Sequence, residues 1–458
     1  MSLGTRAAAI GLACAACAAL LPAHAASAGG GGSAAPGPTR TPIRHFLMLM
    51  QEGHSFDNYF GRYPGADGIP ADACMPTGRA GRCVRPFHLG DRSSSLPHGR
   101  GTFAAQYNRG RMDGFVRALS ELGIKDATGP MGFYGAGDIP FYWNVADNYV
   151  LFDRFFASAA AGSVMNHMYW LTGTPGDRRY PDAIPPGGFG RLPTIFDRLQ
   201  ARGISWKVYV QSYDPAITFR TAGRHRRASQ ATWMPLLSYA RYVDDPRLFG
   251  HIADLSELFT DADRGTLPAV AYIVPAGSSE HPPGSVQAGV RLVRRIVNAL
   301  MLGPAWRSSA FMWTYDTWGG WYDHVPPPRV DRYGYGFRVP ALLVSAWARR
   351  HRVDHTQLDF TSALRFIEAN WRLAPLAARD AKANTFAGAF DFSSGPRAPA
   401  ILPMTRGAPA PAGSRRSVIY AGYGGAAVLA ALLVVLAAAR GPERRPPRRF
   451  ARSRDQER

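Results

Sequence analysis

Two acidic residues stand at the ends of apolar segments that are typical of buried strands. Asp316 directly follows the apolar run 311–315, and Glu52 closely follows the run 43–50. Parallel strands in α/β sheets present functional groups at their carboxyl ends, so both carboxylates are candidates for one site. Acidic strand ends near glycines suit metal or phosphate chemistry. The alternative is that Asp316 only caps the turn that leads to the two glycines at 319–320.

A hydroxyl, an amide and two histidines occur in other segments. Ser163 follows the small residues at 159–162 and precedes Asn166. Small residues allow the backbone to bring a serine to a helix N-terminus, where N–H groups stabilise anions. An ordinary helix N-cap is the other interpretation of Ser163. His98 lies in a loop-rich stretch, and His281 lies just beyond the apolar run 268–275.

These groups together match the needs of phosphoester hydrolysis. A hydroxyl attacks phosphorus, a cation held by carboxylates stabilises charge, and histidines serve the oxyanions or the leaving group. Thr317, Asp323 and His324 follow Asp316 in the same stretch and are further candidate metal ligands. The expected cofactor is a divalent metal ion, and the expected partner is a phosphate-ester substrate.

The surrounding segments predict an α/β fold. Strand patterns alternate with helical patterns, which favours a mostly parallel sheet covered by helices on both faces. The strand patterns lie at 43–50, 204–210, 268–275, 311–315 and 339–347, and the clearest helical patterns at 194–202, 289–302 and 357–373.

The two ends of the chain read as targeting segments. Residues 1–25 resemble a secretory signal, although an N-terminal anchor is an alternative, and 26–41 form a flexible lead-in. A domain over 42–392 is followed by a Pro/Ala/Gly-rich linker at 393–417. Residues 418–439 carry no charge and as a helix would span about 33 Å, enough for a bilayer; a buried core helix is the alternative.

The basic tail at 440–458 would then lie in the cytoplasm. This organisation predicts a single-pass protein of the cell membrane with its domain on the outer side. Much of the net charge of +20 comes from this tail, and the remaining arginines are scattered, so nucleic-acid binding is not expected. Arginines on an exported surface could attract phosphorylated substrates instead. Cys74 and Cys83 are expected to form a disulfide.

Several motifs resemble one known family. They are IRHFLMLMQEGHSFDNYFG, GRMDGF, DIPFYWNVADNYVLFDRFF, MYWLTGT, SEHPP, YDTWGGWYDHVPP, RVPALLVSAWAR and a terminal FDF, spread over 43–392. The chain resembles the bacterial phosphoesterase family that contains the phosphatidylcholine-type phospholipases C and the AcpA-like acid phosphatases, within the alkaline-phosphatase-like superfamily.

The resemblance implies a three-layer α/β/α sandwich with the site at the strand ends. It also implies residue roles. Glu52 and Asp316 match metal ligands, Ser163 matches the nucleophile, Asn166 matches the asparagine just after it, and His98 and His281 match active-site histidines. Asp323 and His324 match the motif and are the further candidate metal ligands.

The chain departs from the family pattern at the ligands. Gly53 replaces an asparagine, Thr317 replaces a second carboxylate, and His167 replaces an arginine near the nucleophile. Two lost oxygen ligands would weaken a site for a hard cation. Thr317 could ligate through its hydroxyl, and His54 or His167 could supply nitrogen, which would favour a borderline metal such as zinc.

Three functions are compatible with these observations. The first is a membrane-tethered phosphoesterase that cleaves a diester, with phospholipid head groups as a natural substrate, or a monoester. The second is a degenerate member that binds phosphorylated or lipid ligands without turnover, which the two missing ligands would explain. A sulfatase-like enzyme is less consistent, because residues 161–166 lack the Pro and Arg that its modified nucleophile requires.

Overall fold

The computed structural model describes residues 38–78, 82–90, 95–176, 184–225, 229–282 and 284–406. The predicted signal segment, most of the lead-in, nearly half of the linker, the segment 418–439 and the basic tail lie outside these residues. The disulfide between Cys74 and Cys83 is confirmed. It lies at a small hairpin formed by β2 (Met75–Pro76) and β3 (Cys83–Val84).

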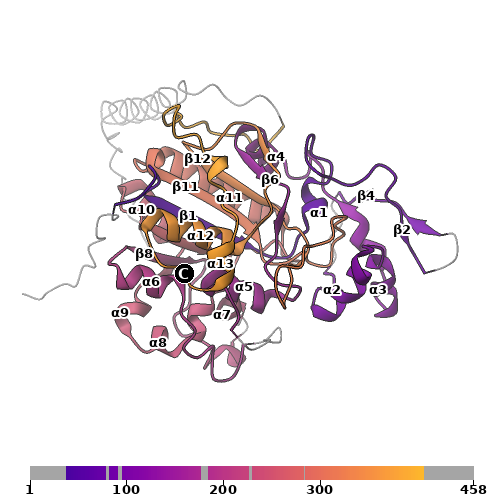
Figure 1. The fold of residues 1–458 in the computed structure, drawn as a ribbon, viewed down its shortest axis with the longest axis horizontal. Helices are drawn as coiled ribbons and strands as arrows, with labels where there is room; N and C mark the ends of the chain where they lie inside the picture. The colour runs from indigo at the N-terminus through magenta and orange to yellow at the C-terminus, as the bar shows by residue number, and fades with distance from the viewer. Residues whose placement is uncertain are drawn as a thin grey trace, which may run out of the picture. The chain divides into compact units, whose positions relative to one another are not determined.

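An eight-stranded sheet forms the centre of the described chain, in the order β13-β6-β12-β11-β1-β10-β8-β9 (Figure 1). Its two central strands are buried along their whole length, as expected for strands covered on both faces. The strands are β1 (His45–Gln51), β6 (Val150–Phe152), β8 (Trp206–Val210), β9 (Ile252–Asp254), β10 (Val270–Val274), β11 (Ser309–Tyr315), β12 (Ala341–Ser345) and β13 (Arg352–Asp354).

The sheet is mostly parallel, as predicted, with one exception. Strand β1 pairs in parallel with β10 and with β11. Strand β12 is antiparallel to both of its neighbours, β11 and β6. The carboxyl ends of β1 and β11 therefore meet at one edge of the sheet, next to each other.

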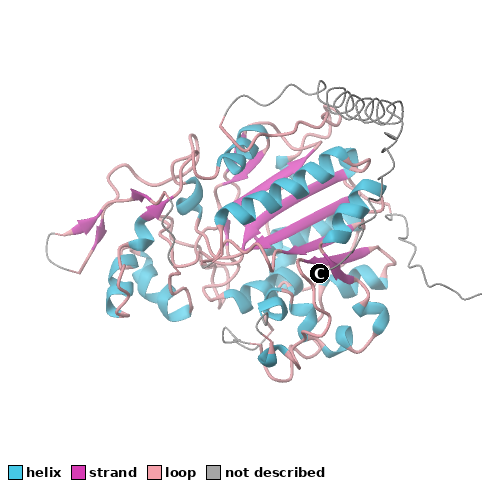
Figure 2. Ribbon diagram, turned by 180° about the vertical axis from the view of Figure 1, so that it is seen from behind, coloured by secondary structure: helices cyan, strands magenta, loops and turns pink. Residues whose placement is uncertain are grey.

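Helices cover both faces of the sheet, which confirms the layered α/β arrangement (Figures 1 and 2). On one face, Phe46 of β1 packs on Phe366 of α12 (Phe360–Trp371), and Tyr272 of β10 stacks on Trp170 of α5 (Ser163–Thr172). Helix α6 (Ile195–Ala201) lies on the same face. The opposite face carries α4 (Pro140–Asn148), α10 (Ser256–Arg264) and α11 (Val286–Leu302).

A smaller apolar cluster lies beside the main core. It includes Phe103 from α2 (Arg100–Tyr107), Phe115 from α3 (Phe115–Glu121), and Trp318 from the loop after β11. Phe337 completes the contacts between these elements. The cluster places the start of α2 and the loop after β11 close to the strand ends.

The prediction of a membrane-spanning helix requires correction. No helix in the described part of the chain is long and apolar enough to cross a membrane. The 17-residue helix α11 carries Arg291, Arg294 and Arg295. This result overturns the transmembrane part of the predicted fold class and the predicted single-pass location, although 418–439 lies outside the described residues.

Candidate active site

Three buried side chains converge at the carboxyl edge of the sheet. Glu52 comes directly after β1, Asp316 comes directly after β11, and His167 projects from α5. Each offers one ligand atom, and the three atoms all lie within 4.8 Å of one another. We call these three residues the ligand cluster.

The converging atoms have no hydrogen-bond partner among the described residues. They are Glu52 Oε1, His167 Nε2 and Asp316 Oδ2, and the first two lie 3.6 Å apart. A buried polar atom without a partner is costly, and most such atoms in folded proteins are paired. Three such atoms facing one another fit the ligand set of a cation.

The other side-chain polar atoms of Asp316 and His167 already have hydrogen-bond partners. Asp316 Oδ1 accepts hydrogen bonds from the N–H groups of Gly53 (3.0 Å) and Thr317 (2.6 Å). His167 Nδ1 donates to the carbonyl oxygen of Ser163 at 2.9 Å, which leaves the Nε2 lone pair for a ligand. Hydrogen bonds of this kind orient metal ligands in proteins.

The pKa shifts of the ligand cluster also favour binding of a cation. Burial, and then the neighbouring Asp316 carboxylate, raise the pKa of Glu52 well above its usual range. Burial lowers the pKa of His167 and favours the neutral imidazole, which is the form that binds metals. A divalent cation would compensate the two carboxylates, and three protein ligands would leave a coordination position open, as in catalytic zinc sites.

Ser163 is the first residue of α5, one helical turn before His167. It lines a cavity of about 530 Å³ together with His98, Gly99 and Trp233. Its position gives it access to the N–H groups at the start of a ten-residue helix.

His98 lines this cavity, and the ring of His281 lies next to that of His98. Their ring centroids are 4.8 Å apart, and His98 Nδ1 lies 2.8 Å from the carbonyl oxygen of Leu96. Burial, with a further contribution from His98, lowers the pKa of His281 to about 4, so this ring is neutral at pH 7. The two predicted histidines are therefore brought together.

Gly53 makes room for His281. A Cβ atom at Gly53 would lie 2.6 Å from His281 Nδ1, and the backbone φ of +63° is in the left-handed region that favours glycine. Gly53, which replaces the family's asparagine, therefore leaves the space that the His281 ring occupies.

Asn166 supports the turn that presents Ser163. Its side chain is buried, and its Oδ1 accepts from the N–H of Ala159 at 2.9 Å. Its Nδ2 donates to the carbonyl oxygens of Ala161 (3.2 Å) and Gly162 (3.1 Å). These contacts with the backbone give Asn166 a positioning role.

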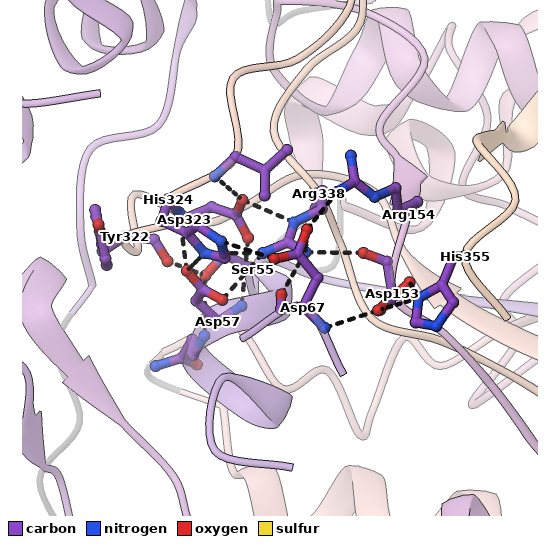
Figure 3. A network of polar contacts seen from close by, with 12 residues as sticks. Ser55, Asp57, Asp67, Asp153, Arg154, Tyr322, Asp323, His324, Arg338 and His355 are labelled. Carbon is purple, nitrogen blue, oxygen red and sulfur yellow. Dashed lines mark hydrogen bonds and ion pairs between the residues drawn. The ribbon is translucent and has the colours of Figure 1, made fainter. Parts of the chain in front are cut away.

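The structure places Asp323 and His324 in a different cluster, together with Asp57 (Figure 3). Arg338 lies among them, with Nε 2.9 Å from Asp323 Oδ1 and Nη2 3.0 Å from Asp57 Oδ1. His324 Nδ1 lies 2.7 Å from the second oxygen of Asp57. The positive charge that these carboxylates require comes from Arg338, which sequence reasoning had not identified.

The structure places the three alternative ligands, Thr317, His54 and His167, differently. The Thr317 hydroxyl lies 3.4 Å from Asp316 Oδ1, beside the ligand cluster. His54 is occupied elsewhere, because Nδ1 faces Asn58 Oδ1 at 2.7 Å and Nε2 faces the carbonyl oxygen of Glu280 at 3.2 Å. Of the two histidines considered, His167 is therefore the one that reaches the cluster.

Glu280, a buried acid that directly precedes His281, was not identified from the sequence. Glu280 accepts hydrogen bonds from the hydroxyls of Tyr59 (2.6 Å), Tyr142 (2.5 Å) and Tyr315 (2.8 Å). The three tyrosines come from separate segments, so the sequence does not show that they meet around Glu280. The only indication in the sequence was that Glu280 stands next to the candidate residue His281.

Comparison with known proteins identifies the family. Residues 43–374 match the model of the phosphoesterase family, described as "Phosphoesterase family". The chain belongs to the phosphoesterase family. The resemblance inferred from the motifs is therefore confirmed.

The curated relatives carry phospholipase C names. "Non-hemolytic phospholipase C" of Burkholderia pseudomallei is 28% identical, over 80% of this chain and 61% of its own length. "Phospholipase C B" of Mycobacterium tuberculosis is 26% identical, over 78% of this chain and 79% of its own length. The chain thus spans less than two thirds of the Burkholderia relative.

A solved structure titled as a protein in the alkaline phosphatase superfamily, from Vibrio parahaemolyticus, covers 71% of this chain and 66% of its own. It matches at 11% identity with a TM-score of 0.36. A likeness at this level supports no conclusion about fold or function.

Proposed function

We propose that this protein hydrolyses phosphate esters, with Ser163 as nucleophile and a divalent cation in the ligand cluster. The observation that carries the proposal is the convergence of three unpartnered ligand atoms beside the helix that Ser163 begins. The phospholipase C names of the relatives favour a phosphodiester such as a phospholipid as substrate. Cleavage of a monoester by the same groups is the second candidate.

The reaction proceeds in two steps. In the first step, the Ser163 hydroxyl loses its proton and forms a bond to phosphorus, while the bond from phosphorus to the leaving oxygen breaks and that oxygen takes up a proton. In the second step, the oxygen of a water molecule forms a bond to phosphorus while the bond from phosphorus to Ser163 Oγ breaks. The water loses a proton, Oγ takes one up, and the phosphate product leaves. The cation, when bound, would supply stabilisation of the charge on the phosphoryl oxygens.

Other residues of the site bind the phosphoryl group, protonate the leaving group or hold Ser163 and the cation in position. His281, neutral at pH 7 because of burial, is a hydrogen-bond partner for phosphoryl oxygens, and His98 beside it is the candidate for protonating the leaving group. Asn166 holds the turn before Ser163 in place. Glu52, His167 and Asp316 would hold the cation.

Hydrolysis assays on the purified full chain test the proposal. A chromogenic phosphomonoester and its phosphocholine diester are offered across a panel of divalent metals to the wild type and to Ser163→Ala. The matched control is Ser256→Ala, because Ser256 also begins a helix, α10, away from the site. We expect metal-dependent diester cleavage that is lost in Ser163→Ala and retained in the control.

No turnover by the folded wild type with any metal or ester would contradict the proposal. It would favour a member of the family that binds phosphorylated ligands without cleaving them, for which Gly53 and Thr317 are the specific support. Turnover that survives in Ser163→Ala would refute the role of the serine alone.

The metal preference has a separate test. Two carboxylates and one imidazole form a mixed oxygen and nitrogen set that favours a borderline cation such as zinc over calcium or magnesium. We expect zinc to remain with the wild type after dialysis and to be lost from His167→Asn, with His351→Asn on the exposed surface as the control. Retention of zinc by His167→Asn would show that the imidazole of His167 is not a zinc ligand.

A further inference from the structure

A second cavity, of about 540 Å³, is lined by cationic side chains. Its wall is formed by α2, by the residues just after it, and by the loop over 327–335. We call it the arginine cavity. Its charged lining consists of Arg100, Arg109, Arg329, Arg332 and Asp331.

Three of these arginines carry uncompensated charge. Arg100, Arg109 and Arg329 form no ion pair with a carboxylate among the described residues, and all three are exposed to solvent. In a protein, neighbouring guanidinium groups that lack counter-ions are typical of sites for phosphate and other oxyanions, because each offers several donors in a planar fork.

The one acid in the lining does not neutralise them. Asp331 Oδ1 lies 2.8 Å from a guanidinium nitrogen of Arg379, which is outside the lining. The same oxygen accepts the N–H groups of Tyr333 at 2.8 Å and Gly334 at 3.1 Å. Asp331 is therefore engaged by other groups, and the described lining of the cavity keeps a net positive charge.

Aromatic rings complete the wall. Phe103, Tyr107, Tyr333 and Tyr335 line the cavity. Flat apolar walls with a few cationic groups suit an organic molecule that carries an anionic group. The lining therefore fits a phosphate ester better than a purely apolar ligand.

The arginine cavity lies near the turn that precedes Ser163. A small cavity of about 90 Å³ shares Arg100, Ala160, Arg332 and Tyr333 with it, and is also lined by Ala161 and Met165. Ala161 stands two residues before Ser163, and Arg100 stands two residues after His98. The two larger cavities thus flank the turn that presents Ser163.

We propose that the arginine cavity is a second anion site that binds a phosphate group through Arg100, Arg109 and Arg329. The phosphate can come from a soluble compound or from the headgroup of an anionic lipid. Binding here requires no reaction at Ser163, so the inference goes beyond the proposed hydrolysis and can be tested without turnover.

The test measures binding in the full chain with Ser163→Ala as the common background. Inorganic phosphate is titrated calorimetrically at low salt into this protein, into Arg109→Gln with Arg329→Gln, and into the control pair Arg264→Gln with Arg291→Gln. The control pair removes the same charge from exposed positions on α10 and α11. In a second arm, the same proteins are sedimented with phosphatidylcholine vesicles that contain or lack phosphatidic acid.

We expect the cavity pair to weaken phosphate binding about tenfold or more, or to lose one binding site, while the control pair has little effect. Loss of binding to the phosphatidic acid vesicles alone would also support the site and assign its phosphate to a lipid headgroup. Equal effects of the cavity and control pairs in both arms would overturn the proposal and assign binding to general surface charge. Circular dichroism of each variant excludes unfolding as the cause.

Discussion

Replacing Glu280 by glutamine should change how stability depends on pH. Glu280 is fully buried and accepts three tyrosine hydroxyls. Burial raises its pKa to about 7, and the three hydrogen bonds oppose this effect only in part. Glutamine has the same shape, retains one acceptor oxygen and does not titrate.

The size and sign of the effect follow from the shifted pKa. A carboxyl whose pKa rises from its ordinary 4.5 to about 7 on folding prefers its proton in the folded state. Its stabilising contribution is complete below about pH 4.5 and is lost as the pH rises through about 7, a loss of about 3 kcal/mol. Glu280→Gln lacks this loss, so its stability relative to the wild type should increase by about that amount between about pH 5 and about pH 8.

Urea unfolding of both chains at several pH values measures this difference. The buried histidines and other titrating groups are present in both chains, so most of their pH dependence cancels. A difference that stays constant, or that shifts in favour of the wild type as pH rises, would refute the reasoning. It would mean that the tyrosine hydroxyls hold Glu280 in its charged form.

Three further changes have expected outcomes. Gly53→Asn restores the family's residue but should lower catalytic efficiency, because its Cβ would displace His281; Gly65→Asn, with φ +79° and open space around it, is the control. Equal activity of both variants would show that His281 can move without cost. Arg338→Gln leaves buried carboxylates without their counter-charge and should lower the unfolding free energy by about 3–5 kcal/mol, whereas a loss below about 1 kcal/mol in urea unfolding would contradict this account. Serine at both Cys74 and Cys83 should cost about 2–3 kcal/mol and leave hydrolysis intact, and an unchanged urea midpoint would count against it.

The central strands were predictable because their burial leaves a simple pattern. The apolar runs 43–50 and 311–315 became β1 (His45–Gln51) and β11 (Ser309–Tyr315), and the acids that follow them meet at one edge. The run 339–347 became β12 (Ala341–Ser345), but its antiparallel direction was not predicted. An apolar strand has the same composition in either direction. The lack of a helical pattern between Asp316 and this strand was the available signal, because a parallel connection needs a crossover.

The site was only partly predictable, because proximity in sequence differs from proximity in space. Asp323 and His324 follow Asp316 closely, yet they lie with Asp57 and Arg338. His167 reaches the ligand cluster from α5, and the sequence marked it only as one of two alternative nitrogen donors. Side-chain direction at a helix start depends on packing that a motif does not record.

The account's central claim is that Ser163 carries the phosphoryl group during turnover. Rapid acid quenching of the reaction with the phosphocholine diester, followed by mass spectrometry of the peptides, tests it most directly. We predict a phosphocholine adduct on Ser163, and a phosphate adduct if a monoester is the substrate. A protein that turns over substrate with no adduct on Ser163, or with the adduct on another residue, would contradict the account.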